Sequence, residues 1–232
     1  MDNCILDVQN LSLKYKGSTD IVVSGLSFSI TQGETLGILG RSGCGKSTIA
    51  WTVMGMAEIM GIEANITNMP QGSILFSGRD ILDASERDLR ELRWKQISIV
   101  AQYSMNSFNP IYTISKTMEE TMKRHMPNIT KKDIVIKLNS LMEMVQLDHR
   151  TLHSFPHELS GGMRQRVAIA MSVMLDPKLL ILDEATTGLD VIIEADILHL
   201  IKRIREDRGI SILFISHDKR IHQAFCDRGI QM

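Results

Sequence analysis

The sequence predicts an α/β fold with a mostly parallel sheet core, an antiparallel β layer at the N-terminus and an inserted helical subdomain. Three patterns lead to this prediction. Short apolar stretches alternate with stretches of helical spacing, as in parallel sheets whose strands are joined by helices. Residues 5–14 and 22–30 are two strand-like stretches joined without a helix, so they should pair antiparallel. Residues 103–162 show a loop followed by helical spacing, which indicates the insertion.

The length and composition are those of one globular domain. The chain has 232 residues, of which 44% are hydrophobic and 23% are charged. We expect a single domain over residues 1–232, with residues 1–102 and 163–232 as its core subdomain and residues 103–162 as its helical subdomain. The net charge of −1 gives no general attraction to nucleic acid, so no nucleic-acid partner is expected.

The sequence also bears on location. No apolar run reaches about 18 residues, so no segment is expected to span a membrane. The N-terminus lacks the basic and apolar regions of a signal peptide. The three cysteines, Cys4, Cys44 and Cys226, are far apart and form no C-x-x-C. A disulfide or zinc framework is therefore not expected, and a reducing cytoplasm fits.

The individual elements follow from local patterns along the chain. Residues 5–14 largely alternate apolar and polar side chains, whereas residues 35–39 and 178–183 are apolar runs typical of buried parallel strands. Helical spacing places Ile134 and Leu138 on one face. The predicted strands are residues 5–14, 22–30, 35–39, 72–78, 97–101, 178–183 and 211–215. The predicted helices are residues 48–54, 85–92, 115–125, 131–145, 160–175 and 191–205, and residues 104–110 are a predicted loop.

A glycine-rich loop between a strand and a helix is the first functional motif. Residues 40–47 read G-R-S-G-C-G-K-S, which matches the phosphate-binding pattern G-x-x-x-x-G-K-[S/T]. The glycines let backbone N–H groups point inward, and the helix start adds its dipole. Lys46 would bind the β- and γ-phosphates and Ser47 would bind Mg²⁺; the alternative is an ordinary glycine-rich turn. The nucleotide-binding candidates here are Gly40, Ser42, Gly43, Cys44, Gly45, Lys46, Ser47 and Thr48.

Polar side chains follow three further predicted strands. They are Gln102, the pair Asp183 and Glu184, and His217. Ligands of parallel sheets bind beyond the carboxyl ends of the strands, so these residues can share one site with the phosphate loop. Asp183 would hold Mg²⁺ through water, and Glu184 would act on a water that attacks the γ-phosphate. His217 would contact the γ-phosphate, and Gln102 would sense Mg²⁺ or water. The alternative for Asp183 and Glu184 is an ordinary turn after a strand. The alternative for His217 is a helix cap, and the alternative for Gln102 is a surface glutamine.

A second helix start, Ser160-Gly161-Gly162, has a good N-cap followed by two glycines. It is a second candidate anion site, 120 residues after the first. One nucleotide cannot easily reach two helix starts in separate subdomains of one chain. A dimer in which each copy completes the other's nucleotide site would use both helix starts. The alternative for residues 160–162 is the start of an ordinary capped helix.

Taken together, these motifs resemble those of the ATP-binding subunit of ABC transporters. Residues 40–47 match Walker A, residues 179–183 Walker B, residues 159–165 the signature motif and residues 187–190 the D-loop. The resemblance implies that Gln102 is the Q-loop glutamine, His217 the switch histidine and Glu184 the catalytic base. It also implies that Asp190 lies at the nucleotide interface and that Tyr15 stacks on adenine. Two subunits would close head to tail around two Mg-ATP.

Three stretches resemble the oligopeptide, dipeptide and nickel importers more closely: residues 107–110, 156–158 and 186–191. This resemblance implies ATP-driven uptake of peptides or nickel and other metal complexes. The partners would be a homodimeric or heterodimeric ATPase subunit, transmembrane permease subunits and, indirectly, a solute-binding receptor. The chain would be peripheral, at the cytoplasmic face of the cell membrane. Two alternatives stay open: a soluble ABC ATPase acting in translation or DNA repair, and a regulatory module without turnover.

Two departures from the family pattern are visible. Ala185 stands where the family usually has proline after the Walker B glutamate, which affects the turn that carries Glu184. The sequence also ends after residues 226–232, where the family is expected to continue into a further strand and hairpin.

Overall fold

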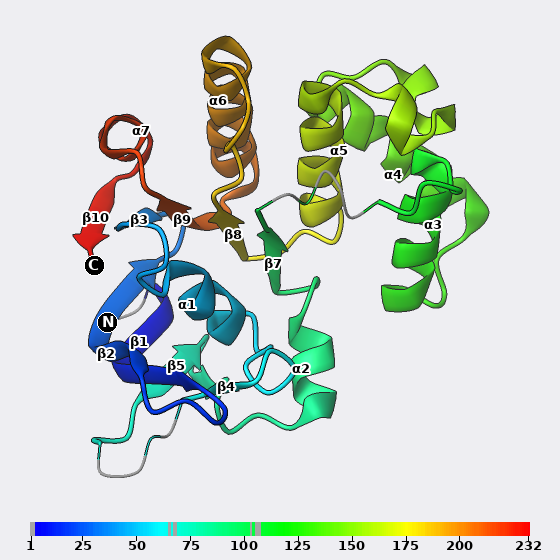
Figure 1. Ribbon diagram of the computed structural model, residues 1–232. Coiled ribbons are helices and arrows are strands. Elements are labelled where there is room, and N and C mark those ends of the chain that lie inside the picture. The colour runs from blue at the N-terminus through cyan, green and yellow to red at the C-terminus, as the bar shows by residue number, and fades with distance from the viewer. Residues whose placement is uncertain (1–2, 65, 67–68, 103, 105–107) are drawn as a thin grey trace.

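The structure contains two β-sheets with helices packed between and beside them (Figure 1). It is a computed structural model that describes residues 3–64, 66, 69–102, 104 and 108–232. The first sheet has the order β2-β1-β5-β6, with β4 paired to β1, and its described pairs are antiparallel. Its strands are β1 (Cys4–Tyr15), β2 (Ile21–Thr31), β4 (Ile62–Glu63), β5 (Ser73–Phe76) and β6 (Arg79–Asp80).

The second sheet is parallel and has the order β10-β3-β9-β8-β7. Because the strands are parallel, their carboxyl ends share one edge, and each strand meets partners that are distant in sequence. Its strands are β3 (Thr35–Leu39), β7 (Ile97–Val100), β8 (Leu179–Asp183), β9 (Ser211–Ser216) and β10 (Arg228–Gln231).

Most helices begin where the sequence supplies a capping side chain. In helices α2 to α7 the side chain of the N-cap residue accepts a hydrogen bond from a backbone N–H of the first turn, which satisfies a group that the helix leaves unpaired. The helices are α1 (Lys46–Val53), α2 (Glu86–Leu92), α3 (Ile114–His125), α4 (Lys131–Met144), α5 (Gly161–Val173), α6 (Val191–Arg208) and α7 (Lys219–Phe225). Two 3₁₀ turns are His149–His153 and Pro156–Glu158.

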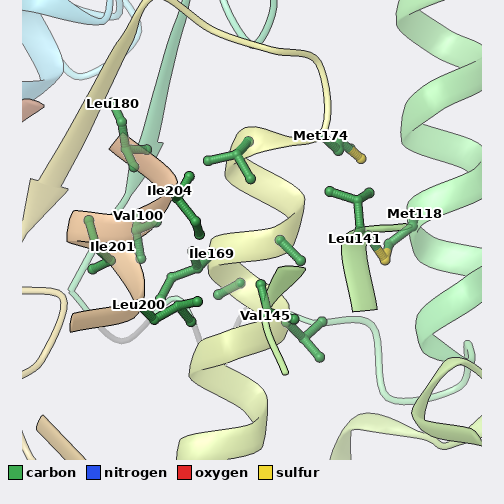
Figure 2. Close-up of a cluster of buried hydrophobic side chains, with 14 of the residues drawn as sticks. Val100, Met118, Leu141, Val145, Ile169, Met174, Leu180, Leu200, Ile201 and Ile204 are labelled. Atoms are coloured by element: carbon green, nitrogen blue, oxygen red, sulfur yellow. The ribbon is translucent and has the colours of Figure 1, made fainter. Parts of the chain in front are cut away.

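The parallel sheet is buried on both faces. On one face, Leu179 and Ile181 of β8 join a cluster that includes α1 and the antiparallel sheet. On the other, Leu180 and Leu182 join a cluster that includes helices α3 to α6. Figure 2 shows this second cluster, with side chains from the sheet, α5 and α6 meeting at its centre. Burial on both faces explains the continuous apolar run of β8.

The predicted fold class is confirmed, and the main elements lie close to where the sequence places them. The antiparallel strands β1 and β2, with 12 and 11 residues, extend one residue beyond each end of the predicted stretches 5–14 and 22–30. Helix α6 continues to Arg208, where Gly209 ends it in the left-handed conformation. Helix α7 and strands β4, β6 and β10 were not predicted. In β10, Ile230 is the only strongly apolar side chain, and pairing with β3 rather than hydrophobic pattern defines this strand.

The loop expected at residues 104–110 and the importer-like stretch 107–110 lie partly outside the described residues, as does the start of the helical subdomain at residue 103. Within the described chain, no helix is long and apolar enough to cross a membrane. Cys4, Cys44 and Cys226 are free thiols.

Candidate functional site

The phosphate loop joins β3 to α1 and wraps around Lys46. The Lys46 Nζ donates hydrogen bonds to the carbonyl oxygens of Gly40 and Arg41, each at 2.9 Å, and the residue is 4% exposed. Gly43 and Gly45 have φ values of 81° and 97°, a region in which side chains other than glycine are strained. Unlike α2 to α7, helix α1 has no side-chain cap, which leaves its first N–H groups for an anion.

Glu184 lies at the meeting point of four motifs. Its Oε1 lies 3.7 Å from Lys46 Nζ and 3.4 Å from His217 Nδ1. Its Oε2 accepts a hydrogen bond from Gln102 Nε2 at 3.3 Å and a longer one from Thr187 Oγ1 at 3.5 Å. The ends of β3, β7, β8 and β9 therefore contribute to one cluster, as the parallel topology predicts. The structure also shows that Asp218, not His217, caps α7.

Asp183 is the other acidic residue at this edge, and it differs from Glu184 in environment. It is the last residue of β8 and is 2% exposed, and its Oδ1 has no hydrogen-bond partner among the described residues. Burial raises the pKa of Asp183, as does Glu184, while the Ser47 hydroxyl and Lys46 oppose the shift. A buried carboxylate oxygen without a partner beside a serine hydroxyl fits Mg²⁺, which prefers oxygen ligands and keeps water and phosphate in its shell.

Two further predicted residues lie near the phosphate loop. The hydroxyl oxygen of Tyr15, at the end of β1, is 3.1 Å from Thr48 Oγ1 in α1. Tyr15 is 44% exposed, so its ring is accessible. A cavity of about 590 Å³ is lined by the phosphate loop, Glu184, His217, Gln231 at the end of β10, and Met232 beyond that strand. The end of β10 was not among the predicted site residues.

The other predicted residues lie apart from this cluster. Ser160 caps α5 by accepting a hydrogen bond from Met163 N at 3.3 Å, and α5 begins well away from α1 (Figure 1). A Cβ built on Gly161 would meet nothing within 4 Å, so the backbone there is open to a ligand. Asp190 caps α6 through Ile193 N at 2.9 Å. The described chain does not bring Ser160, Gly161, Gly162 or Asp190 to its own phosphate loop.

Two side chains at the site were not predicted from the sequence. Thr187 contacts Glu184, and Gln165 donates a hydrogen bond from α5 to the carbonyl oxygen of Ala185 at 2.6 Å. Thr187 lies within the D-loop stretch 187–190. That motif indicated that the residue lies near the site, but it did not indicate the contact with the Glu184 carboxylate. Gln165 is the last residue of the signature stretch 159–165, but its neighbours Arg164 and Arg166 are charged and only partly buried, so the local sequence does not mark it as a buried contact.

Comparison with known proteins identifies the family. The model of the ABC transporter family matches residues 23–187, and the chain belongs to this family, as the motifs predict. It is 35% identical over 232 residues to a probable peptide ABC transporter ATP-binding protein of Sinorhizobium fredii, covering 98% of this chain and 68% of that protein. It is 37% identical to a dipeptide transport ATP-binding protein of Bacillus subtilis, covering 97% of this chain and 66% of that protein. It is 36% identical to an oligopeptide transport ATP-binding protein of Escherichia coli, covering 99% and 67%.

Solved structures agree on the fold. A Clostridium perfringens protein described as part of an ABC transporter complex is 29% identical, with a TM-score of 0.81 over 100% of this chain and 85% of that one. A bacterial ABC transporter cassette solved as a dimer is 23% identical, with a TM-score of 0.81 over 98% and 94%. The present chain spans about two thirds of the length of the curated relatives named above.

Proposed function

We propose that the chain is the ATP-binding and ATP-hydrolysing subunit of an importer that takes up peptides through a partner permease. The observation that carries the proposal is the Glu184 carboxylate, which lies within reach of Lys46, His217 and Gln102 beside an uncapped helix start. The relatives named above are peptide-transport proteins, which favours peptides over nickel or other metal complexes as cargo.

In this proposal, the phosphate groups of ATP replace Glu184 as the partner of Lys46. The N–H groups at the start of α1 and the Lys46 ammonium hold the phosphates, while Ser47 and Asp183 would hold Mg²⁺, which would neutralise phosphate charge when bound. Glu184, released from Lys46, accepts the proton of the water that attacks the γ-phosphorus, while the bond from the γ-phosphorus to the β,γ-bridging oxygen breaks and ADP leaves. His217 and Gln102 orient that water and the γ-phosphate. Positioning and charge neutralisation supply most of the catalysis, as in other phosphoryl transfers.

The distance between the two helix starts supports a dimer in this proposal. Ser160, Gly161 and Gly162 of one subunit would meet the γ-phosphate held by Lys46 of the other, with Asp190 at the same interface. Tyr15 would stack on adenine. The partner is a second copy or a related ATPase subunit. Closure would pass through Gln102 and the helical subdomain, residues 103–162, to the permease at the cytoplasmic face of the membrane, while a solute-binding receptor selects the cargo.

Two measurements on the purified chain test the proposal. The wild-type chain should release phosphate from Mg-ATP, and Lys202→Ala, a change on the exposed face of α6, should release it at the same rate. Affinity purification from membranes of the source cell should recover a multi-spanning protein in stoichiometric amounts. Recovery of ribosomes or DNA instead would point to a soluble ABC ATPase, and absence of turnover would point to a regulatory module; either result contradicts the proposal.

A further inference from the structure

Gln165 of α5 is a buried amide that bonds to the backbone next to Glu184. The residue is 1% exposed, and its Nε2 donates to the carbonyl oxygen of Ala185 at 2.6 Å. Ala185 is itself 5% exposed. Because water cannot replace either partner here, the bond fixes the Gln165 side chain and the Ala185 carbonyl in one arrangement.

The turn that Gln165 contacts has a strained backbone. Glu184 has a φ of 48°, in the left-handed region that residues other than glycine rarely adopt. Such a conformation persists where its surroundings determine it. The Glu184 N–H donates to the Ile215 carbonyl oxygen at 3.0 Å, and the Thr187 N–H donates to the Glu184 carbonyl oxygen at 3.1 Å. Gln165 adds a hydrogen bond from α5, so the orientation of the Glu184 carboxylate depends on where α5 lies.

Helix α5 also carries the second candidate anion site. Gln165 comes three residues after Gly162, within the same run of helix. Gly162 lies against α6, because a Cβ built on it would be 3.0 Å from Ile193 Cγ2. Helix α5 thus makes two contacts. Gln165 contacts Ala185, near the start of the segment 184–190, and Gly162 lies against Ile193, in the first turn of α6, which follows that segment. A helix moves as a rigid unit, so displacement of its N-terminus is felt at both contacts.

We propose that Gln165 is a positioning residue that couples occupation of the anion site at the start of α5 to the orientation of Glu184 in the same chain. The inference rests on the proposed function, in which the start of α5 meets the nucleotide held by the partner subunit. Occupation of one nucleotide site then changes the position of the catalytic base in the other. In each subunit, the hydrogen bond from Gln165 to the Ala185 carbonyl oxygen carries this coupling to Glu184.

The substitution Gln165→Met tests the bond, because methionine has a similar length and no donor. Turnover at saturating Mg-ATP should fall about 10- to 100-fold, since small displacements of a catalytic group cost rates of this order. The dissociation constant for ATP, measured in a Glu184→Gln background, should change less than about 2-fold because the phosphate loop is untouched. A loss of affinity with unchanged turnover would overturn the positioning role.

Ser172→Ala is the matched control. Ser172 is also buried in α5, and its hydroxyl donates to the Ile169 carbonyl oxygen at 2.7 Å within the helix, without contacting the Glu184 turn. The Ser172→Ala variant should lose a comparable buried hydrogen bond and keep the turnover of the wild type. If both variants lose stability equally and both keep wild-type turnover, Gln165 has only a structural role and the inference is wrong.

A double-mutant cycle tests the coupling itself. If Gln165 transmits the effect of the α5 start, then Ser160→Ala combined with Gln165→Met should turn over about as slowly as the slower single variant. Rate losses that multiply would show that the two residues act independently.

Gln165→Asn is a second variant, to be used if Gln165→Met does not fold. It keeps the amide group on a side chain that is one carbon shorter. It should also lose turnover with unchanged ATP affinity, and a wild-type rate would again overturn the inference. An active wild type with unaffected variants contradicts this inference alone, whereas a wild type without ATP hydrolysis contradicts the proposed function.

Discussion

The Lys46 ammonium and the Glu184 carboxylate lie 3.7 Å apart, both largely buried, so the phosphate-binding cation and the candidate base are ion-pair partners. An ion pair out of water needs good geometry to offset the loss of hydration. Here the remaining Lys46 donors bond to the Gly40 and Arg41 carbonyl oxygens. ATP is therefore expected to exchange one anionic partner of Lys46 for another.

We predict that Glu184→Gln retains ATP binding and loses at least about 100-fold in turnover, since an amide cannot accept the proton of the attacking water. The variant should also accumulate as an ATP-bound dimer. Phosphate release and size-exclusion chromatography with ATP measure the two effects. Glu206→Gln, on the exposed face of α6, is the control and should match the wild type. Wild-type turnover in Glu184→Gln would remove Glu184 from its role.

Lys46→Ala should weaken ATP binding itself about 10- to 100-fold, the range expected for loss of charged hydrogen bonds. Isothermal titration calorimetry measures the affinity directly, without dependence on hydrolysis. The buried Gly40 carbonyl oxygen and the partly buried Arg41 carbonyl oxygen also lose their partner, so thermal unfolding should be recorded in parallel. Unchanged affinity in a folded variant would be incompatible with phosphate binding at this loop.

Alkylation of Cys44 should be slowed by ATP. The thiol lies inside the phosphate loop, where a Cβ built on Gly40 would be 2.6 Å from the Cys44 sulfur. The chain contains its own references: Cys4 is exposed on the antiparallel sheet, and burial raises the pKa of Cys226 to about 12, so that thiol should react slowly. Peptide mass spectrometry distinguishes the three sites. Equal Cys44 labelling with and without ATP would place the nucleotide elsewhere.

His222 should make the protein less stable in acid. Its imidazole packs against the backbone of two strands, since a Cβ on Gly37 of β3 or Gly229 of β10 would come within 2.1 Å or 2.7 Å of the ring. Burial lowers the pKa of His222. The unfolded chain therefore takes up a proton below about pH 6.5 before the folded chain does, which costs up to about 1.4 kcal/mol of stability per pH unit.

Urea unfolding at pH 7.5 and pH 5.5 measures this effect. His222→Leu should lose less stability than the wild type over this interval, and His199→Gln, at an exposed position of α6, should behave as the wild type. Burial and nearby Lys95 and Arg124 also lower the pKa of His125, so part of the acid sensitivity should remain in His222→Leu. An identical loss in His222→Leu and the wild type would contradict the prediction.

The sequence predicted the phosphate loop, the strand-end acids and four of the five strands of the parallel sheet, because each has a local pattern with a physical cause. It did not predict β10, whose single strongly apolar residue, Ile230, is placed by pairing with β3. It also missed the bond from Gln165 to Ala185, because a contact between residues 20 positions apart has no local pattern. The left-handed backbone of Glu184 was hidden for the same reason: the neighbouring chain imposes it.

The strand order of the parallel sheet has a consequence for how the chain folds. Strand β3, which leads into the phosphate loop, pairs with β9 on one side and β10 on the other, and both come more than 170 residues later in sequence. Contacts at such separation form late, because closing long loops costs entropy before the pairing repays it. During synthesis, a chain that has not yet emerged past Ser216 leaves both edges of β3 open. The ability to hold a nucleotide should therefore appear abruptly, near the completion of these last strands, rather than when the phosphate loop itself is made.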